Sequence, residues 1–495
     1  MNKTFLLSFA SLLGIASTLP SKVLPEDQQS RHFQAINQHL DFGGVLYGYV
    51  DVDGDVDKLI DLAGGFIETM RITNPRDFPF EIDLKRILQA TGLDKIKGIG
   101  ASSYKDGDRF RNKILILAPG ERHGLLKIVG DQPHAFKSWS LAPTGADLVV
   151  EQDLNGQAVY EVVLDIAGIV MGHEGRGMIE AQVRQPVPDL GFTLEKVIKD
   201  LDLTISVVVD VHENRLLRVP DVPEPGVKVP LTDAIVVIDK LGWLVDHLVP
   251  LAQEEEELRV FRNLQWEGIE LNEAAPGDFK IYKPSMMKHL RSGSLVLTTR
   301  REFAERCFSE KQSLAEDLKF QAAMEGLPRK GNAFAYMAPT IHKTIEGIIK
   351  QIPKEEMGGV EVSVAMSLVS FFIPGKDGPE TSVTVNLPEG FLTTGNSGSS
   401  LKAGFATTIF AGPMLTQYAV VMPMMLYAQY QQQEVFIDEA AFVDDIEAIE
   451  VPVQEFIPEG EAKNNELKKK AREIERIRRR LEQQERKVPT VPEGD

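Results

Sequence analysis

The chain has 495 residues, of which 43% are hydrophobic, so it can bury more than one core and has the length of roughly two to four folding units. Its 73 acidic and 54 basic side chains give a formal charge of −19, which opposes nonspecific binding to nucleic acid or anionic lipid, because both require a positive surface. The single cysteine, Cys307, excludes an intrachain disulfide and, in the apolar pattern of residues 303–308, is predicted to be a small buried side chain.

The first 17 residues have the pattern of a secretory signal peptide. Lys3 gives a short basic start, and the stretch from Thr4 to Ser17 is apolar, ends among small residues and is too short to span a bilayer. A buried N-terminal helix is the alternative. We therefore expect an exported protein, periplasmic or secreted. No cysteine follows the signal, which excludes anchoring as an acylated bacterial lipoprotein.

One pattern occurs four times between residues 40 and 395: a short apolar strand, a turn and an amphipathic helix. The strand and helix ranges are 45–50 with 55–70, 147–150 with 157–171, 234–238 with 240–252, and 333–337 with 340–352. Successive starts are roughly 100 residues apart, which indicates domain-sized repeats and not a short-period solenoid. We group them as two pairs of units, 40–225 and 226–395.

Each helix leads to a predicted antiparallel hairpin. In the first unit, a short helix at 83–92 precedes a hairpin of 96–103 with 111–117. In the second, a helix at 193–201 precedes a hairpin of 204–211 with 216–219, around a turn at Glu213 and Asn214. The third hairpin is at 258–271, and the fourth pairs 360–372 with 382–387. Such connections predict an α+β protein with antiparallel sheets covered by helices on one face. Two helix starts, Thr299 with Glu302 and Ser313 with Glu316, fit the capping box.

The C-terminal part changes character at residue 396. Within the apolar segment 396–433, residues 403–433 contain no charged side chain and are long enough to span a bilayer, but prolines and polar residues interrupt them. The acidic linker 434–462 follows, and it lacks the basic flank expected on the cytoplasmic side of a span. We favour a helical segment buried in the protein or at an interface, with a membrane span as the alternative.

Residues 463–488 form a predicted charged helix, followed by a disordered tail at 489–495. Leu467, Ile474, Leu481 and Val488 recur every seventh residue, but Lys470 interrupts the second apolar position, so the coiled-coil pattern is weak. A solvated helix with Glu/Arg pairs fits equally well. This helix and residues 403–433 are the predicted contact regions for a protein partner or an apolar ligand.

The densest acidic cluster, Asp51, Asp53, Asp55 and Asp57, does not match a calcium-binding hand loop. Counted from Asp51, Val56 occupies the position of the required glycine and Leu62 that of the bidentate glutamate. We therefore predict a helix cap at Asp55 and a solvated strand end, with a non-standard cation site as the alternative.

Other candidate motifs also lack their partner residues. Ser399 and Lys402 have the serine–lysine spacing of penicillin-recognising enzymes, but the chain contains neither a Ser-Asp-Asn nor a Lys-Thr-Gly string, so a loop is predicted. His173 with Glu174 resembles the start of a zinc-binding helix, but Gly177 stands where its second histidine should be. His247 and His342 are isolated histidines in helical patterns. Gly98 and Gly100 lack the third glycine of a dinucleotide-binding loop. No catalytic, cofactor-binding or metal residue is predicted.

Several segments resemble a family of exported bacterial proteins that carry a domain of unknown function. They are SGSLVLTTRREFAERCF, SLAEDLKFQAAMEGLP and NAFAYMAP between residues 292 and 339, and GGVLYGYVDVDGDVDKLIDL at 43–62. The resemblance covers most of 45–392 in pattern. It implies recurring strand–helix units and export, and it implies no catalytic residues.

Together these patterns predict an exported, non-enzymatic cell-envelope protein that has a binding or structural role. Two alternatives remain open: an exported hydrolase with a site built from distant loops, tested at Ser399 and Asp53, and a membrane-anchored structural protein.

Overall fold

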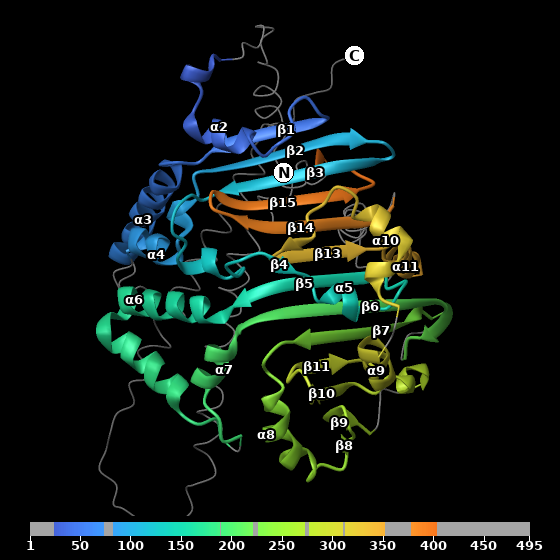
Figure 1. Cartoon of the computed structure of the whole chain (residues 1–495). Coiled ribbons are helices and arrows are strands. Elements are labelled where there is room, and N and C mark those ends of the chain that lie inside the picture. The colour runs from blue at the N-terminus through green and yellow to red at the C-terminus, as the bar shows by residue number, and fades with distance from the viewer. Residues whose placement is uncertain are drawn as a thin grey trace, which may run out of the picture. The chain divides into compact units, whose positions relative to one another are not determined.

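Thirteen strands form one fully antiparallel sheet (Figure 1), in the order β1-β2-β3-β15-β14-β13-β5-β6-β7-β11-β10-β9-β8. The computed structural model describes residues 24–73, 83–188, 190–220, 226–272, 277–309, 312–351 and 378–402. The strands are β1 Leu46–Asp51, β2 Gly98–Asp106, β3 Arg109–Leu117, β5 Leu148–Asn155, β6 Asp202–Arg218, β7 Lys228–Ile238, β8 Leu258–Arg262, β9 Trp266–Leu271, β10 Ser285–His289, β11 Leu295–Thr298, β13 Ala333–Met337, β14 Glu380–Leu387 and β15 Gly390–Ser397. Two short strands, β4 His134–Ala135 and β12 Lys330–Gly331, pair separately.

Helices accompany this antiparallel sheet along the whole described part of the chain, which confirms the predicted α+β class. They are α2 Arg31–Asn37, α3 Asp55–Thr73, α4 Leu84–Thr91, α5 Ser138–Leu141, α6 Gly156–Arg184, α7 Leu194–Asp200, α8 Trp243–Ala252, α9 Arg301–Ser309, α10 Leu318–Ala323 and α11 Pro339–Ile349. Five 3₁₀ turns accompany them, η1 Glu26–Gln28, η2 Leu93–Lys95, η3 Gly124–Lys127, η4 Gly277–Ile281 and η5 Leu314–Glu316. No helix among the described residues is both long and apolar enough to cross a bilayer.

Four parts of the sheet are meanders of consecutive neighbours, β1-β2-β3, β5-β6-β7, β8-β9-β10-β11 and β13-β14-β15. In the third of these, β11 borders β7 and β8 is the edge strand, so the predicted strand 234–238 does not border its hairpin at 258–271. Strand β3 pairs with β15, and β5 pairs with β13. Both predicted pairs of units, 40–225 and 226–395, therefore contribute to the same sheet.

Side-chain caps set several helix boundaries. The Asp83 carboxylate accepts the backbone N–H of Arg86 at 3.0 Å, and Gly92 ends α4 in the left-handed conformation with φ 75°. The predicted helix at 83–92 is thereby confirmed. Thr193 caps α7 in the same way, accepting from the N–H of Lys196 at 3.2 Å.

Neither predicted capping box forms. The Thr299 hydroxyl accepts the N–H of Ala234 at 2.9 Å, because Thr299 continues the β11–β7 pairing and α9 begins only at Arg301. Ser313 precedes the short 3₁₀ turn η5, and its side chain makes no capping bond there. Asp317 caps α10 instead, accepting the N–H of Lys319 at 2.7 Å.

The predicted hairpin turn at Glu213 and Asn214 is wrong. Residues on both sides of it pair with β7, His212 with Leu231 and Leu216 with Pro230, so the chain continues as one strand with a bulge. The hairpin instead joins β6 to β7. In the fourth predicted hairpin, the strand at 382–387 is part of β14, which lies between β13 and β15. Its predicted partner, 360–372, is outside the described residues. Residues 1–17, 403–433, 434–462, 463–488 and 489–495 are outside them as well.

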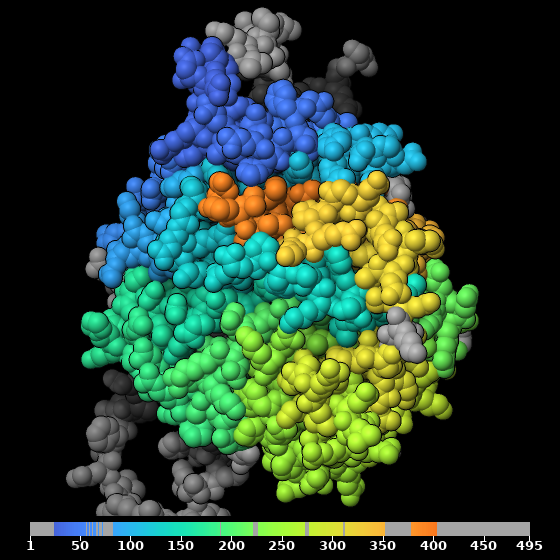
Figure 2. All heavy atoms as spheres, in the orientation of Figure 1, coloured from blue at the N-terminus to red at the C-terminus, as the bar shows by residue number. Residues whose placement is uncertain are grey.

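One face of the sheet, which we call the front face, carries the main core under α5, α9 and α10 (Figures 1 and 2). Its strand residues Val149, Val208, Ile235 and Val296 have no exposed surface. Cys307 on α9 belongs to this core and is 3% exposed, which confirms the buried position predicted for it. Helix cover is not limited to this face, because α8 packs on the opposite face around Val245 and Leu295.

Candidate functional site

The face opposite the front face, which we call the open face, carries a continuous row of apolar side chains. The pairing registers place eight of them side by side across eight strands: Ala335, Val150, Val207, Val236, Leu297, Met286, Ile269 and Val260. All eight are partly exposed, whereas their neighbours in sequence on the front face, such as Val149 and Val208, are fully buried. Both faces of these strands are thus apolar. The front face is closed, whereas the open face is covered in part by α8, against whose cluster Leu297 and Met286 pack.

The same row changes character toward the other edge of the sheet. Beyond Ala335 it continues through Ser382, Gly395, Asn112 and Ser103. These side chains are small or polar. Along this row the open face therefore has an apolar half, from β13 to β8, and a polar half, from β14 to β2.

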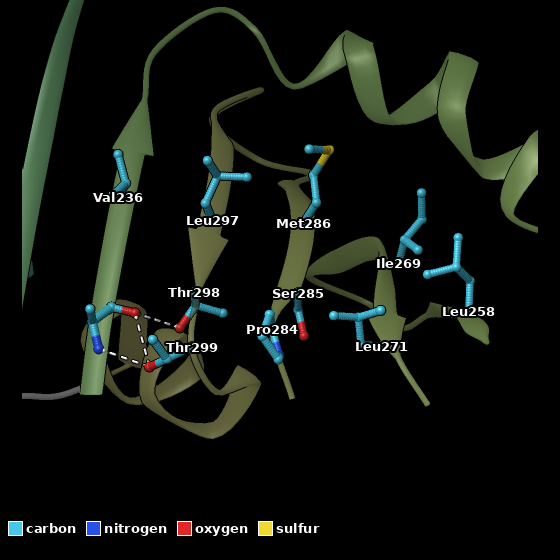
Figure 3. A pocket seen from close by; sticks show the side chains of 11 residues that line it. Val236, Leu258, Ile269, Leu271, Pro284, Ser285, Met286, Leu297, Thr298 and Thr299 are labelled. Atoms are coloured by element: carbon cyan, nitrogen blue, oxygen red, sulfur yellow. Dashed lines mark hydrogen bonds between the residues drawn. The ribbon is translucent and has the colours of Figure 1, made fainter. Parts of the chain in front are cut away.

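A groove of about 410 Å³ lies in the apolar half across β7, β11, β10, β9 and β8 (Figure 3). We call it the β7–β8 groove. Its lining includes Val236, Leu297, Met286, Ile269 and Leu258, which project from five different strands. The volume is within the roughly 300–1,000 Å³ typical of small-molecule sites.

The hydroxyl groups at the groove are already hydrogen-bonded to the main chain. Ser285 donates to the carbonyl of Lys283 at 2.9 Å, and Thr298 donates to that of Ala234 at 3.0 Å. Thr299 accepts the N–H of Ala234 (Figure 3). Because these groups have internal partners, the groove favours hydrocarbon over a ligand that needs directional polar contacts.

A larger and more polar cavity of about 1200 Å³ lies among the β2–β3 turn, α10 and the start of α11. Its carboxylates are Asp106, Asp108, Asp147, Glu316, Asp317 and Glu325, against the cations Arg109 and Lys319. Several of these groups have structural partners: Asp317 caps α10, Glu325 pairs with Arg109 at 2.9 Å, and Asp147 accepts the N–H of Val211 at 2.8 Å. Burial raises the pKa of Asp147. The net negative lining disfavours anionic ligands.

The predicted acidic cluster is held by hydrogen bonds and ion pairs. The Asp51 carboxylate accepts from the hydroxyls of Ser30 and Tyr49, both at 2.8 Å. Burial opposes its ionisation, but these bonds prevail and lower the pKa of Asp51 to about 2. Asp53 pairs with Lys97 at 2.9 Å. Asp55 is the first residue of α3 and pairs with Lys58 at 2.8 Å. The solvated strand end is supported, and Asp55, predicted as the helix cap, is instead the first residue inside the helix.

Ser399 lies in the bend that follows β15, where the sequence predicts a loop, whereas Lys402 follows the turn at Leu401 and is helical. The main-chain carbonyl of Ser399 accepts from the Asn112 amide at 3.0 Å. Its backbone N–H donates to Ser397. The contacts of Ser399 are thus those of a turn residue.

The singled-out histidines lie in different places. His173 and Glu174 are at a kink in α6, where Gly172 has φ 70°. The His247 ring packs against Phe192 and Trp243, and His342 on α11 is 4% exposed. Gly98 and Gly100 are in β2 and pair with β1.

Two buried polar networks were not predicted. Asp233, 1% exposed, accepts from His212 at 2.9 Å and from the Arg300 guanidinium. In the second network, His134 lies 2.7 Å from Asp153. Their partners are far apart in sequence, and the only available signal was a charged residue inside an apolar strand pattern, as at Asp233 and Asp153.

No group of three or more possible ligands that could hold a metal is found within the part of the chain that the structure describes. Comparison with known protein families, curated proteins and solved structures returns no match.

Proposed function

We propose that this is an exported, non-enzymatic binding protein that takes a hydrocarbon-chain ligand in the β7–β8 groove. The observation that carries the proposal is the open apolar row, in which Val236, Leu297 and Met286 line up under the groove. Burying hydrocarbon on such a surface yields roughly 25 cal/mol per Å² without any directional contact. The internally bonded hydroxyls of the groove support the same ligand class.

Binding of dansyl-labelled undecanoic acid to the full-length protein tests the proposal. Met286→Glu places a charge in the groove and should weaken binding by at least roughly tenfold, because burying an unpaired charge is costly. Ala234→Phe fills the groove with apolar volume and should also weaken binding. Leu264→Glu is the matched control, since Leu264 is 99% exposed and does not line the groove. Absence of binding to the wild type, or equal losses in all three variants, would overturn the proposal.

Export is the second element of the proposal and rests on residues 1–17. Fractionation of C-terminally tagged protein in a bacterial host should place it outside the cytoplasm, with these residues removed. A cytoplasmic pool that retains the N-terminus would contradict it.

We also infer that β1-β2-β3, β5-β6-β7 and β13-β14-β15 are related units, and that the chain ends in the charged helix 463–488. The common order of strand, helix and two further strands in these three meanders supports the first inference. Circular dichroism of a peptide of residues 463–488, at several concentrations, tests the second. Concentration-dependent helicity would indicate a coiled coil, and constant helicity a solvated single helix.

A further inference from the structure

The large polar cavity, which we call the strand-end cavity, lies at one end of six neighbouring strands, beside α10 and α11 (Figure 1). These strands are β2, β3, β15, β14, β13 and β5. The cavity shares no lining residue with the β7–β8 groove, so it is a separate site. Its volume of about 1200 Å³ exceeds the roughly 300–1,000 Å³ of most small-molecule sites, which leaves room for an elongated ligand.

The carboxylate of Asp147 is buried in the wall of this cavity without a counter-ion. Asp147 is 7% exposed and accepts the backbone N–H of Val211 at 2.8 Å, but no basic side chain pairs with it among the described residues. Burial raises its pKa, and the neighbouring charges of Asp210 and Glu213 raise it further because they are negative as well. A buried carboxylate ordinarily has a cationic partner, because removing its charge from water is costly. That partner is missing at Asp147.

Two further polar groups of the cavity wall lack hydrogen-bond partners. Tyr336 on β13 is 6% exposed, and its hydroxyl makes no hydrogen bond with the described residues. Asn396 on β15 is 2% exposed, and its amide nitrogen donates to the carbonyls of Ala323 and Glu325. The buried Oδ1 of Asn396 is left without a partner in the described part of the chain. Native proteins rarely leave buried polar groups unsatisfied, so both oxygens indicate a missing hydrogen-bond donor.

Uncompensated negative charge surrounds these acceptors. Asp317 caps α10 through Oδ1 alone, and it forms no ion pair with the described residues. Burial, together with the charges of Asp317 and Asp147, raises the pKa of Tyr336 to about 12, so both carboxylates lie near this hydroxyl. Arg109, one of the two cations of the lining, is already paired with Glu325 at 2.9 Å. The cavity therefore combines acceptor oxygens with unneutralised carboxylates.

We propose that the strand-end cavity binds an organic polycation, whose ammonium groups donate to Asp147, Tyr336 and Asn396. An ammonium group carries three hydrogen-bond donors and no acceptor, which complements a wall of acceptor oxygens. A further carboxylate, Asp108, lines the cavity at the β2–β3 turn, and β3 and β5 are four strands, about 19 Å, apart. A linear polyamine, with charges along its length, matches this spread better than a ligand with one ammonium group.

Isothermal titration calorimetry of the full-length protein with spermidine tests this site and should show saturable binding of one ligand per chain. Tyr336→Phe removes only the hydroxyl and keeps the ring against Phe320, so it should weaken binding about two- to tenfold. Asp147→Asn can still accept the N–H of Val211 but loses the charge, and it should weaken binding at least roughly tenfold. Glu256→Gln is the matched control, since it removes the same charge at an exposed position outside the cavity.

Lys319→Gln gives a second readout that a folding defect cannot imitate. Lys319 is an exposed cation of the cavity lining, so its removal should tighten spermidine binding about two- to fivefold, the usual effect of one exposed charge. Weaker binding by Lys319→Gln would overturn the proposal. So would absence of saturable binding to the wild type, equal losses in Asp147→Asn and Glu256→Gln, or displacement of spermidine by an equal concentration of Ca²⁺. The dansyl-fatty-acid assay concerns the β7–β8 groove, so either proposal can fail without the other.

Discussion

Ser103 and Leu401, 298 positions apart in the sequence, are joined by a 3.1 Å hydrogen bond from the Leu401 N–H to the Ser103 hydroxyl. Ser103 is fully buried and also donates to the Asn112 side chain at 2.6 Å. One hydroxyl thus attaches the residues after β15 to β2, the middle strand of the chain's first meander.

Ser103→Ala should lower the free energy of unfolding by about 1–3 kcal/mol, because two partly buried groups, the Asn112 side-chain oxygen and the Leu401 N–H, lose their bond to the hydroxyl. The turn at Leu401 should also open more often than the rest of the structure. Hydrogen exchange should show faster exchange of the Leu401 amide, with the amides of β7 unchanged as an internal control. An unaltered Leu401 amide would mean that this bond does not hold the turn.

Arg300→Met should destabilise the protein by about 3–5 kcal/mol at pH 7, because the buried Asp233 carboxylate loses its guanidinium partner and keeps only His212. Burial favours the neutral acid, but the bonds from Arg300 and His212 prevail and lower the pKa of Asp233. The pair therefore contributes stability above pH 4, lost as pH falls through the lowered folded-state pKa. Urea denaturation should show a smaller penalty for Arg300→Met near pH 3 than at pH 7, and the double variant with Asp233→Asn should recover part of the loss.

His134 should make stability depend on pH in the opposite direction. Burial acts against its protonation, but the Ala135 carbonyl, Asp153 and Glu151 raise its pKa above 6.5. A raised folded-state pKa contributes stability that is complete below the unfolded value and is lost as pH rises through the folded value. The unfolding free energy of the wild type minus that of His134→Gln should therefore decrease from pH 6 upward. Asp153→Asn should flatten this difference, and a pH-independent difference would refute the assignment.

Local patterns in the sequence predicted most individual elements. The apolar run between Gly331 and Pro339 placed β13 at 333–337, and the Asp83 and Gly92 boundaries placed α4. The turn predicted at Glu213 and Asn214 was wrong, because polar residues typical of a turn also occupy a bulge. Here the partner strand β7 is long enough to pair on both sides of it. The capping box predicted at Thr299 was wrong because its hydroxyl bonds to the backbone N–H of Ala234 in the neighbouring strand β7.

The arrangement of the strands could not be predicted. Residues Val150, Val207 and Val236 read only as apolar strand positions, and their alignment in one row depends on pairings between distant segments. The β7–β8 groove has the same origin. The clue available was that strands such as 234–238 are apolar on both faces, which indicates that both faces need cover.

Phe320 and Phe334 connect α10 to the front face, and their coupling can be measured. The rings are edge to face, with centroids 5.9 Å apart, and both residues are 2% exposed. Each single change to alanine should cost about 3–5 kcal/mol, because a large buried side chain leaves a cavity. The double variant should lose less than the sum by about 0.5–1.5 kcal/mol, the usual coupling of an aromatic pair. Leu318→Ala on the same helix is the control, since Leu318 is 79% exposed and should change stability by less than about 0.5 kcal/mol. Strict additivity of the two phenylalanine changes would show that the helix and the sheet are not coupled through these rings.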